Sequence, residues 1–348
     1  MSRVGLLLIN LGTPDSPQAG DVRRYLDQFL MDPRVLDIGA VQRAALVKLL
    51  ILPRRPKASG EAYAKIWGER GSPLLVNSLD LRDKVQAKLG DGVLVELAMR
   101  YGAPAIPDVL ERMRRAGVDR IVAFPLYPQY ASSSTGSSVQ ALFEAGGADW
   151  NTPYLQVVPP FYDHPSFIAA FANNGRRAMR EIDAERVIFS FHGLPERHCI
   201  KSDDSGSHCL RSPDCCEQIS IANRNCYRAQ CFATARLIGD ALSVPEARRV
   251  ICFQSRLGRD PWIKPYTDQV IVELAKQGVR RALIFSPAFV ADCLETLEEL
   301  GMRAAEDFAH AGGERLLLVP SLNAEDHWVD AVIDIARQSS GWLRDAAV

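Results

Sequence analysis

Short apolar runs alternate with longer amphipathic stretches along the whole of this chain. Apolar runs without a polar face are typical of buried parallel strands, and the stretches between them repeat apolar residues at helical spacing. The expected strands are Val4–Leu11, Val93–Ala98, Arg120–Leu126, Tyr154–Val158, Arg186–His192, Arg249–Gln254, Arg281–Ser286 and Arg315–Val319. Clear helical patterns cover Leu79–Leu89, Ala105–Ala116, Ser166–Glu181, Leu294–Phe308 and Asp326–Arg344. This alternation favours parallel βαβ units.

The strand count predicts the fold class and the domains. Four strands in each half indicate an α/β protein with two similar doubly wound domains and a cleft between them. At 348 residues the chain is about twice as long as a typical domain, which agrees with this division. We place the first domain at residues 1–163 and the second at 164–325, and we expect 326–348 to pack back as a helix.

Composition and charge exclude several classes of protein. The net charge of −1 gives no electrostatic footprint for a nucleic-acid partner. The apolar runs are too short to span a bilayer. Val4–Leu11 runs into Gly12-Thr13-Pro14 without a small-residue cleavage site, so it is expected to be a strand and not a signal peptide. We therefore expect a cytoplasmic protein.

One of the apolar runs ends in a histidine. Val187–Phe191 has no polar face, and His192 follows where this strand should stop, before Gly193 and Pro195 break the backbone into a loop. Ligand sites in open α/β sheets lie beyond the carboxyl ends of strands. His192 is therefore a candidate general base or metal ligand, and the alternative is a core histidine bonded to a backbone carbonyl.

Two glutamates follow the seventh expected strand. Glu295 and Glu299 are four residues apart and would share one face of a helix. Such a pair would attract a cation or take up protons at the carboxyl end of a strand, as at His192. Alternatively, Asp292 caps the helix and Glu295 closes a capping box, but this gives no role to Glu299.

Residues 29–57 combine an apolar side with a basic end. Leu46–Leu52 is almost entirely apolar, and Arg54, Arg55 and Lys57 follow it. We expect a lip that covers a hydrophobic ligand or rests on a membrane surface. The alternative is a core helix with a solvated basic end.

Cysteines are concentrated in one segment. Six of the eight are Cys199, Cys209, Cys215, Cys216, Cys226 and Cys231. The polar stretch Lys201–Ser207 runs through this segment and cannot build a hydrophobic core. In a reducing cytoplasm, thiolate-bound metal is favoured over disulfides. So many thiolates suit an iron–sulfur cluster, with zinc as the second choice.

Several separate motifs lie in a fixed order from one end of the chain to the other. They are Ile9-Asn10-Leu11-Gly12-Thr13-Pro14, Gly71-Ser72-Pro73-Leu74, Met99-Arg100-Tyr101, Tyr127-Pro128-Gln129-Tyr130, Phe191-His192-Gly193-Leu194-Pro195, Phe253-Gln254-Ser255 and Asp292-Cys293-Leu294-Glu295-Thr296-Leu297. In this order they resemble the ferrochelatases, which insert ferrous iron into a porphyrin to make haem. The resemblance covers nearly the whole chain.

The resemblance implies a fold and a set of site residues. The fold is two Rossmann-like domains, each with a four-stranded parallel sheet, and an active site in the cleft. His192 is implied as the active-site histidine, Glu295 as the essential acid facing it, and Glu299 as a continuation of the acidic path. His192 and Glu295 would both meet the Fe²⁺ substrate. The residues implied near the porphyrin are Leu11, Trp262 and Phe289 along the ring, Ser72, Arg100, Tyr101 and Tyr130 at its polar edge, and Arg54 and Arg55 by the propionates.

The chain also departs from relatives at two single positions. Leu11 stands where coproporphyrin-using relatives usually carry tyrosine, which favours protoporphyrin IX as the substrate. Cys293 replaces a histidine of the animal enzymes, which weakens the case for a metal relay there.

The cysteine segment differs more strongly from the corresponding segment of cluster-free relatives. Cluster-free relatives pass in a few residues from the His-Gly-Leu-Pro motif to a Tyr-x-x-Gln-Cys stretch, here residues 227–231, so Cys231 matches a cysteine of those forms. The longer segment is similar to one that holds a [2Fe–2S] cluster in a subset of bacterial ferrochelatases. By this resemblance the ligands are Cys209, Cys215, Cys216 and Cys226, with Cys199 as the spare.

The implied activity is that of a lyase which inserts Fe²⁺ into protoporphyrin IX, the last step of haem biosynthesis. We also expect the protein to make transient contact with the inner face of the cytoplasmic membrane. The alternatives to this activity are a chelatase for coproporphyrin III or another tetrapyrrole, and a haem- or iron-binding protein without chemistry. A binding protein needs no base, so His192 and the acid pair argue against it. The sequence does not determine the oligomeric state.

Overall fold

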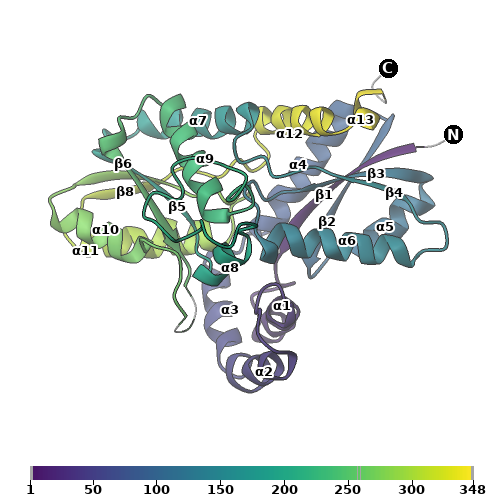
Figure 1. The fold of residues 1–348 in the computed structure, drawn as a ribbon, viewed down its shortest axis with the longest axis horizontal. Coiled ribbons are helices and arrows are strands. Elements are labelled where there is room, and N and C mark those ends of the chain that lie inside the picture. The colour runs from purple at the N-terminus through teal and green to yellow at the C-terminus, as the bar shows by residue number, and fades with distance from the viewer. Residues whose placement is uncertain (1–2, 257, 259, 346–348) are drawn as a thin grey trace. The chain divides into compact units, whose positions relative to one another are not determined.

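The structure is a computed structural model that describes residues 3–256, 258 and 260–345. These residues form two compact units, each built on one sheet (Figure 1). The first comprises the described residues of Met1–Tyr127, Ser132–Pro159 and Asn323–Val348, and the second comprises Pro128–Ala131 and Pro160–Leu322. The tail therefore belongs to the first unit, and the predicted domain limits near 163 and 325 stay predictions.

The first unit contains a four-stranded parallel sheet in the order β2-β1-β3-β4. Its strands are β1 (Arg3–Gly12), β2 (Val93–Tyr101), β3 (Val118–Pro125) and β4 (Tyr154–Val157). Leu6–Ile9 in the central strand β1 is fully buried, because helices cover both faces of the sheet.

The helices of the first unit are α1 (Ala19–Met31), α2 (Ala40–Ala45), the π-helix η1 (Leu46–Ile51), α3 (Arg55–Ile66), α4 (Pro73–Leu89), α5 (Ile106–Arg115), the π-helical turn η2 (Ser132–Gly136), α6 (Ser137–Ala148), α12 (Asp326–Ser339) and α13 (Gly341–Asp345). They cover this sheet, except that α2, η1 and α3 pack on α1 and project away from the strands (Figure 1).

The second unit repeats the arrangement with strand order β6-β5-β7-β8, again all parallel. Its strands are β5 (Arg186–His192), β6 (Arg249–Gln254), β7 (Arg281–Phe285) and β8 (Arg315–Leu318). In the register of β5 and β6, His192 lies opposite Gln254. The helical segments are α7 (Pro165–Met179), α8 (Glu196–Lys201), α9 (Tyr227–Ala241), the 3₁₀ turn η3 (Glu246–Arg248), α10 (Thr267–Lys276), the π-helix η4 (Glu295–Ala304) and α11 (Ala305–His310).

All eight expected strands are present, and the predicted α/β class with two four-stranded parallel sheets is confirmed. The helical pattern predicted over Leu294–Phe308 is divided between η4 and α11. The alternative capping box is wrong, because the helix begins at Glu295 without a side-chain cap and Asp292 instead accepts a hydrogen bond from the Thr296 hydroxyl at 2.9 Å. A π-helix at this point is notable, since π-turns are frequent at functional sites.

Candidate active site

His192 is the last residue of β5, and its ring is fixed by the next residue of the chain. Nδ1 lies 2.7 Å from the carbonyl oxygen of Gly193. A carbonyl oxygen can only accept, so Nδ1 carries the proton and Nε2 keeps its lone pair in the neutral ring. The edge of the Phe289 ring faces the imidazole, with ring centroids 6.2 Å apart. In the neutral form of His192, Nε2 is therefore the atom that can accept a proton.

Gly193 allows a close approach of three chain segments. Its amide donates to the carbonyl oxygen of Gln254 at 2.7 Å. A Cβ at this position would lie 2.8 Å from that oxygen and 3.2 Å from the ring of Trp262. Trp262 is itself held beside the loop by a β-bridge to Pro195. Only glycine fits here without moving the loop that orients His192.

Gln254 connects the strand of His192 with the helix of Glu295. Its side chain is 4% exposed. Nε2 donates to the backbone carbonyl of Glu295 at 2.9 Å, and Oε1 accepts from the hydroxyl of Ser190 on β5 at 2.8 Å. The structure therefore brings His192 and Glu295 into one unit and joins them through a single buried residue.

Glu299 is held by Ser255. The Ser255 amide donates to one carboxylate oxygen of Glu299 at 3.1 Å, and the hydroxyl donates to the other oxygen. Ser255 has a φ of 65°, the left-handed region that side chains other than glycine seldom adopt. Both donors thus reach one carboxylate from a strained backbone.

Glu295 has a thiol as its neighbour. The Cys293 side chain is buried and hydrogen-bonded to the Glu295 carboxylate. Burial, together with the negative charge of Glu295, raises the pKa of the Cys293 thiol well above its usual range. Cys293 is therefore a neutral donor to Glu295. Glu298, on the same helix, instead forms an ion pair with Arg303 at 3.1 Å.

Arg100 and Tyr101 are engaged in a buried network in the first unit. Asp32 accepts from the Arg100 guanidinium at 2.7 Å, from the Tyr101 hydroxyl at 2.8 Å and from the Ser137 hydroxyl at 2.5 Å. Burial alone would raise the pKa of Asp32, but these hydrogen bonds and the charge of Arg100 together lower it. Tyr101 is 2% exposed, so its hydroxyl serves this network. Sequence reasoning missed Asp32.

The other expected porphyrin residues occupy varied positions. Ser72 is buried and accepts from the hydroxyl of Thr13 at 2.8 Å. Leu11, Tyr130, Trp262 and Phe289 are half-buried, and Arg54 and Arg55 are exposed next to the start of α3. The backbone amide of Tyr130 donates to Gln230 at 2.6 Å.

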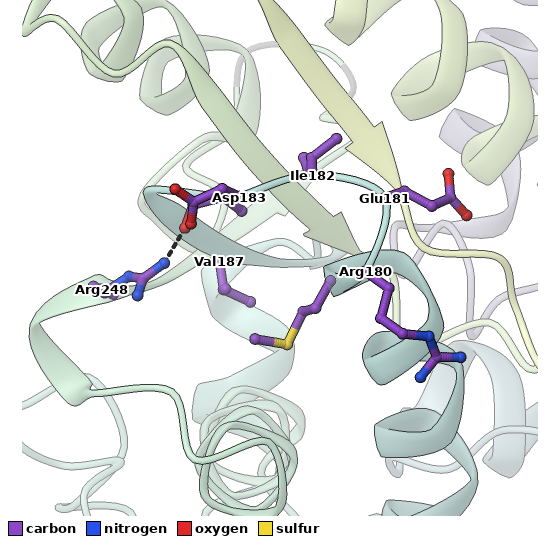
Figure 2. Close-up of a pocket in the computed structure, with 8 residues that line it drawn as sticks. Arg180, Glu181, Ile182, Asp183, Val187 and Arg248 are labelled. Atoms are coloured by element: carbon purple, nitrogen blue, oxygen red, sulfur yellow. Dashed lines mark hydrogen bonds between the residues drawn. The ribbon is translucent and has the colours of Figure 1, made fainter.

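A cavity of about 370 Å³ lies beside Val187, near the start of β5 (Figure 2). His192 is at the other end of this strand. The walls of the cavity include Val187 and the loop from Met179 to Ala184. Arg248 lines it too and donates to the carbonyl of Ala184. None of the expected site residues lines this cavity.

Comparison with known proteins decides the family. The profile of the Ferrochelatase family matches residues 3–340. This chain belongs to the ferrochelatase family. A protein named Ferrochelatase from Coxiella burnetii (strain Dugway 5J108-111) is 44% identical over 338 residues, which cover 97% of this chain and 94% of that protein. One of the same name from Pseudomonas putida (strain F1) is 46% identical over 341 residues, covering 97% of this chain and 100% of that protein.

Solved structures support the fold of this ferrochelatase-family chain. SirB from Bacillus subtilis with Fe³⁺ has a TM-score of 0.55 at 13% identity, covering 97% of this chain and 96% of that one. The sirohydrochlorin chelatase SirB from Bacillus subtilis subspecies spizizenii in complex with cobalt has a TM-score of 0.54 at 10% identity, with coverages of 97% and 95%. At these identities the likeness shows the fold alone.

The cysteine segment of this ferrochelatase homologue is folded inward. Cys209, Cys215, Cys216 and Cys226 are all buried, although much of the surrounding chain is exposed, and none is in a disulfide. Their thiols form a series of contacts: Cys209 with Cys226, Cys226 with Cys216, and Cys216 with Cys215, whose sulfurs lie 3.7 Å apart. Cys199 also contacts Cys226, and this hydrogen bond raises the pKa of Cys226 to about 11.

The contacts between these thiols can be compared with the ligand arrangements of a single zinc ion and of a [2Fe–2S] cluster. Among the described residues, no group of three or more His, Cys, Asp or Glu side chains is arranged around a single metal ion. A single zinc ion would draw four ligands into one tetrahedral shell, whereas a [2Fe–2S] cluster takes two thiolates on each of two irons. The thiols do not form two separate pairs, because Cys226 contacts Cys199, Cys209 and Cys216. Arg228 donates to Cys216 Sγ at 3.0 Å, so a cation already faces this group.

The expected lip, residues 29–57, runs from the end of α1 through α2 and η1 to the start of α3, and α1 contacts each of the other three helices. Val41, Leu49 and Leu50 on α2 and η1 are exposed, Leu49 by 71%. None of the helices among the described residues is long and apolar enough to cross a bilayer. The lip therefore presents apolar side chains at the surface while Val47 and Leu52 are buried.

Proposed function

We propose that this chain inserts Fe²⁺ into protoporphyrin IX, giving protohaem and two protons. Membership of the ferrochelatase family supports metal insertion. The observation that carries the assignment of the chemistry is the His192 ring, whose Nδ1–H is committed to Gly193. Its Nε2 is therefore left as an acceptor for a pyrrole proton.

Metal insertion requires two pyrrole N–H bonds to break while all four ring nitrogens bind iron. His192 Nε2 accepts one of these protons as a general base. Glu295 provides negative charge that stabilises the incoming Fe²⁺ or accepts the second proton. Its backbone is fixed by Gln254, and its carboxylate accepts from the Cys293 thiol. Glu299, held by Ser255, continues the acidic path along the same helix.

Leu11 supports protoporphyrin IX as the substrate. It is a half-buried apolar side chain near the carboxyl end of β1. An apolar group there suits a vinyl-bearing ring edge better than a propionate, because an unpaired carboxylate is costly beside apolar surface. In the same proposal, Arg54 and Arg55 bind the propionates, and Trp262 and Phe289 contact the ring.

The experiment compares the two porphyrins directly. Fe²⁺ insertion is followed anaerobically by the loss of porphyrin fluorescence, with protoporphyrin IX and coproporphyrin III as competing substrates. We expect kcat/KM to be at least about tenfold higher for protoporphyrin IX, which corresponds to about 1.4 kcal/mol of transition-state binding. A preference for coproporphyrin III would overturn the substrate assignment. Tight haem retention without any metal insertion would favour the binding-protein alternative.

We also propose that Cys209, Cys215, Cys216 and Cys226 hold a [2Fe–2S] cluster, with Cys199 outside the ligand set. The burial of all four thiols within a polar segment supports this, because such a segment has little apolar surface of its own to order it. A bound cluster supplies four metal–sulfur bonds that tie this segment together. Its proposed role is structural or regulatory.

The lip provides a third proposal, contact with the surface of a membrane. Exposed Leu49 and Leu50 lie a few residues from exposed Arg54 and Arg55. This combination of apolar and basic side chains is typical of helices that rest in the interfacial region of a bilayer. Such contact would suit a sparingly soluble porphyrin, and we propose that it is transient and occurs at the inner face of the cytoplasmic membrane.

A further inference from the structure

Gln254 and Ser255, at the end of β6, hydrogen-bond to the segments that carry all three proposed reacting groups. The carbonyl of Gln254 accepts from Gly193, whose own carbonyl fixes the His192 ring. The side chain of Gln254 donates to the carbonyl of Glu295. Ser255 then donates twice to the carboxylate of Glu299. Two consecutive residues thus contact the loop of the base and both acids.

The helix that carries the acids needs such support. Glu295 and Glu299 lie in the first turn of η4, a π-helix with i→i+5 bonding. The first amides of any helix lack internal hydrogen-bond acceptors, and η4 has no side-chain cap. Gln254 and Ser255 hold this uncapped turn from outside, because they donate to the carbonyl of Glu295 and to the carboxylate of Glu299.

Ser255 makes its hydrogen bonds to Glu299 from a strained backbone conformation. A serine in the left-handed region is strained, because its Cβ lies too close to the following carbonyl oxygen. Ser255 has a φ of 65° and nevertheless makes both bonds to Glu299. Strain of this kind is concentrated at functional sites, where the surrounding structure enforces it.

We propose that Gln254 and Ser255 act as a clamp that positions His192, Glu295 and Glu299 for metal insertion. They are positioning residues, because they act through the base and the acids. The inference rests on the proposed function. Its physical basis is that a base and an acid displaced by about 1 Å lose on the order of 100-fold in rate, even when the substrate still binds.

Ser255→Ala and Ser255→Gly test the clamp as a pair. Both remove the hydroxyl that donates to Glu299, but glycine also removes the strain of the positive φ. We expect both variants to lower kcat at least tenfold while the Kd for protoporphyrin IX, from fluorescence titration, changes less than twofold. We also expect Ser255→Gly to melt at a higher temperature than Ser255→Ala. Both variants should then lose kcat although their stabilities differ.

Ser243 provides the matched control. It also has a positive φ, 55°, and lies exposed in the loop after α9. Ser243→Ala and Ser243→Gly should show the same order of melting temperatures as the Ser255 pair with kcat unchanged. This separates the effect of the backbone strain from that of the hydrogen bond to Glu299.

Gln254→Glu and Gln254→Met test the other half of the clamp. Glutamate keeps the size of the side chain and can still accept from Ser190, but it has no N–H to donate to Glu295. Both variants should lose kcat at least tenfold, whereas Gln277→Met, which removes a distant bond to Glu273, should not. Where a Gln254 variant fails to fold, the Ser255 pair decides.

The clamp and the proposed function fail in different ways. A wild-type protein that inserts no metal overturns the proposed function and the clamp with it. An active wild-type protein whose Ser255 variants keep kcat within twofold overturns the clamp alone. Equal losses of kcat and of porphyrin affinity would also overturn it, because they would indicate a structural role only.

Discussion

The imidazole of His192 donates from Nδ1 to the carbonyl oxygen of Gly193, 2.7 Å away. This one bond selects the tautomer, because a carbonyl cannot donate in return. It also makes the orientation of the base depend on the backbone of Gly193, which Gln254 holds from the other side. A substitution of His192 therefore tests the chemistry of the ring, and a substitution of Gly193 tests its placement.

His192→Ala should abolish metal insertion while porphyrin binding persists. Loss of a general base typically costs 100-fold to 10,000-fold in rate. We expect kcat to fall at least about 100-fold, with the Kd for protoporphyrin IX changed by less than threefold. His310→Ala, at the exposed end of α11, is the control and should be fully active. Near-normal turnover by His192→Ala would show that another group is the base.

Gly193→Ala should disturb the placement of His192 without removing it. The new Cβ would lie 2.8 Å from the Gln254 oxygen, so the loop must shift at a cost of about 1–3 kcal/mol. We expect a lower melting temperature and at least a tenfold loss of kcat. Gly147→Ala, at an exposed helical position with no atom within 4 Å of the new Cβ, should be neutral or slightly stabilising. A fully active Gly193→Ala would contradict the role of this close approach.

Glu295 and Glu298 should respond in opposite ways to substitution by glutamine. Glu295→Gln keeps size and hydrogen bonding but removes the charge, so we expect kcat to fall at least about 100-fold at an unchanged melting temperature. Glu298→Gln weakens the ion pair with partly exposed Arg303, which costs about 1 kcal/mol of stability and should leave kcat unchanged. Thermal melts and steady-state rates of the two variants, measured side by side, check both expectations. Equal rates for Glu295→Gln and wild type would remove Glu295 from the reaction.

The strands could be predicted from the sequence because burial on both faces leaves an unbroken apolar run. Val187–Phe191 is the clearest case, and its prediction also placed His192 correctly at the strand end. The π-helix could not be predicted. Apolar residues at helical spacing suit both an α-helix and the slightly wider π-turn, so the pattern over Leu294–Phe308 does not distinguish them.

The connections within the site depend on contacts between distant parts of the chain. Gln254 and Ser255 belong to a motif that carries the family resemblance, yet nothing local indicates that one bonds to residue 295 or that the other has a positive φ. Asp32 likewise meets Arg100 and Tyr101 only through the packing of α1 against β2. The types and spacing of residues in the sequence can suggest which groups react. The residues that position those groups can be identified only from the folded structure.

Purified anaerobically, the protein should contain two iron and two sulfide per chain and show visible charge-transfer bands. Substituting serine for any proposed ligand should bleach these bands, since a hydroxyl is a poor substitute for thiolate; the variants are Cys209→Ser, Cys215→Ser, Cys216→Ser and Cys226→Ser. Cys252→Ser, on buried β6, should keep the colour. Cys199→Ser should keep it too.

Arg228 gives a finer test of the same cluster. Arg228→Met removes the N–H donor to Cys216 while keeping an apolar stem beside Phe232. We expect the bands to remain but to decay faster in air. A colourless wild-type protein with one zinc per chain would refute the cluster and leave the proposed chelatase activity intact.

Leu49→Asp/Leu50→Asp should weaken binding to vesicles of phosphatidylethanolamine and phosphatidylglycerol. Leu49 and Leu50 are 71% and 55% exposed, so charged replacements cost little in the folded protein but cannot enter the interfacial region. Arg54→Glu/Arg55→Glu should weaken binding further at low salt, because each basic residue near an anionic surface contributes about 1 kcal/mol. Trp150→Asp is the control, since Trp150 is 99% exposed but lies outside the lip. Cosedimentation measures the bound fraction, and equal binding by wild type and the lip variants would remove the lip from membrane contact.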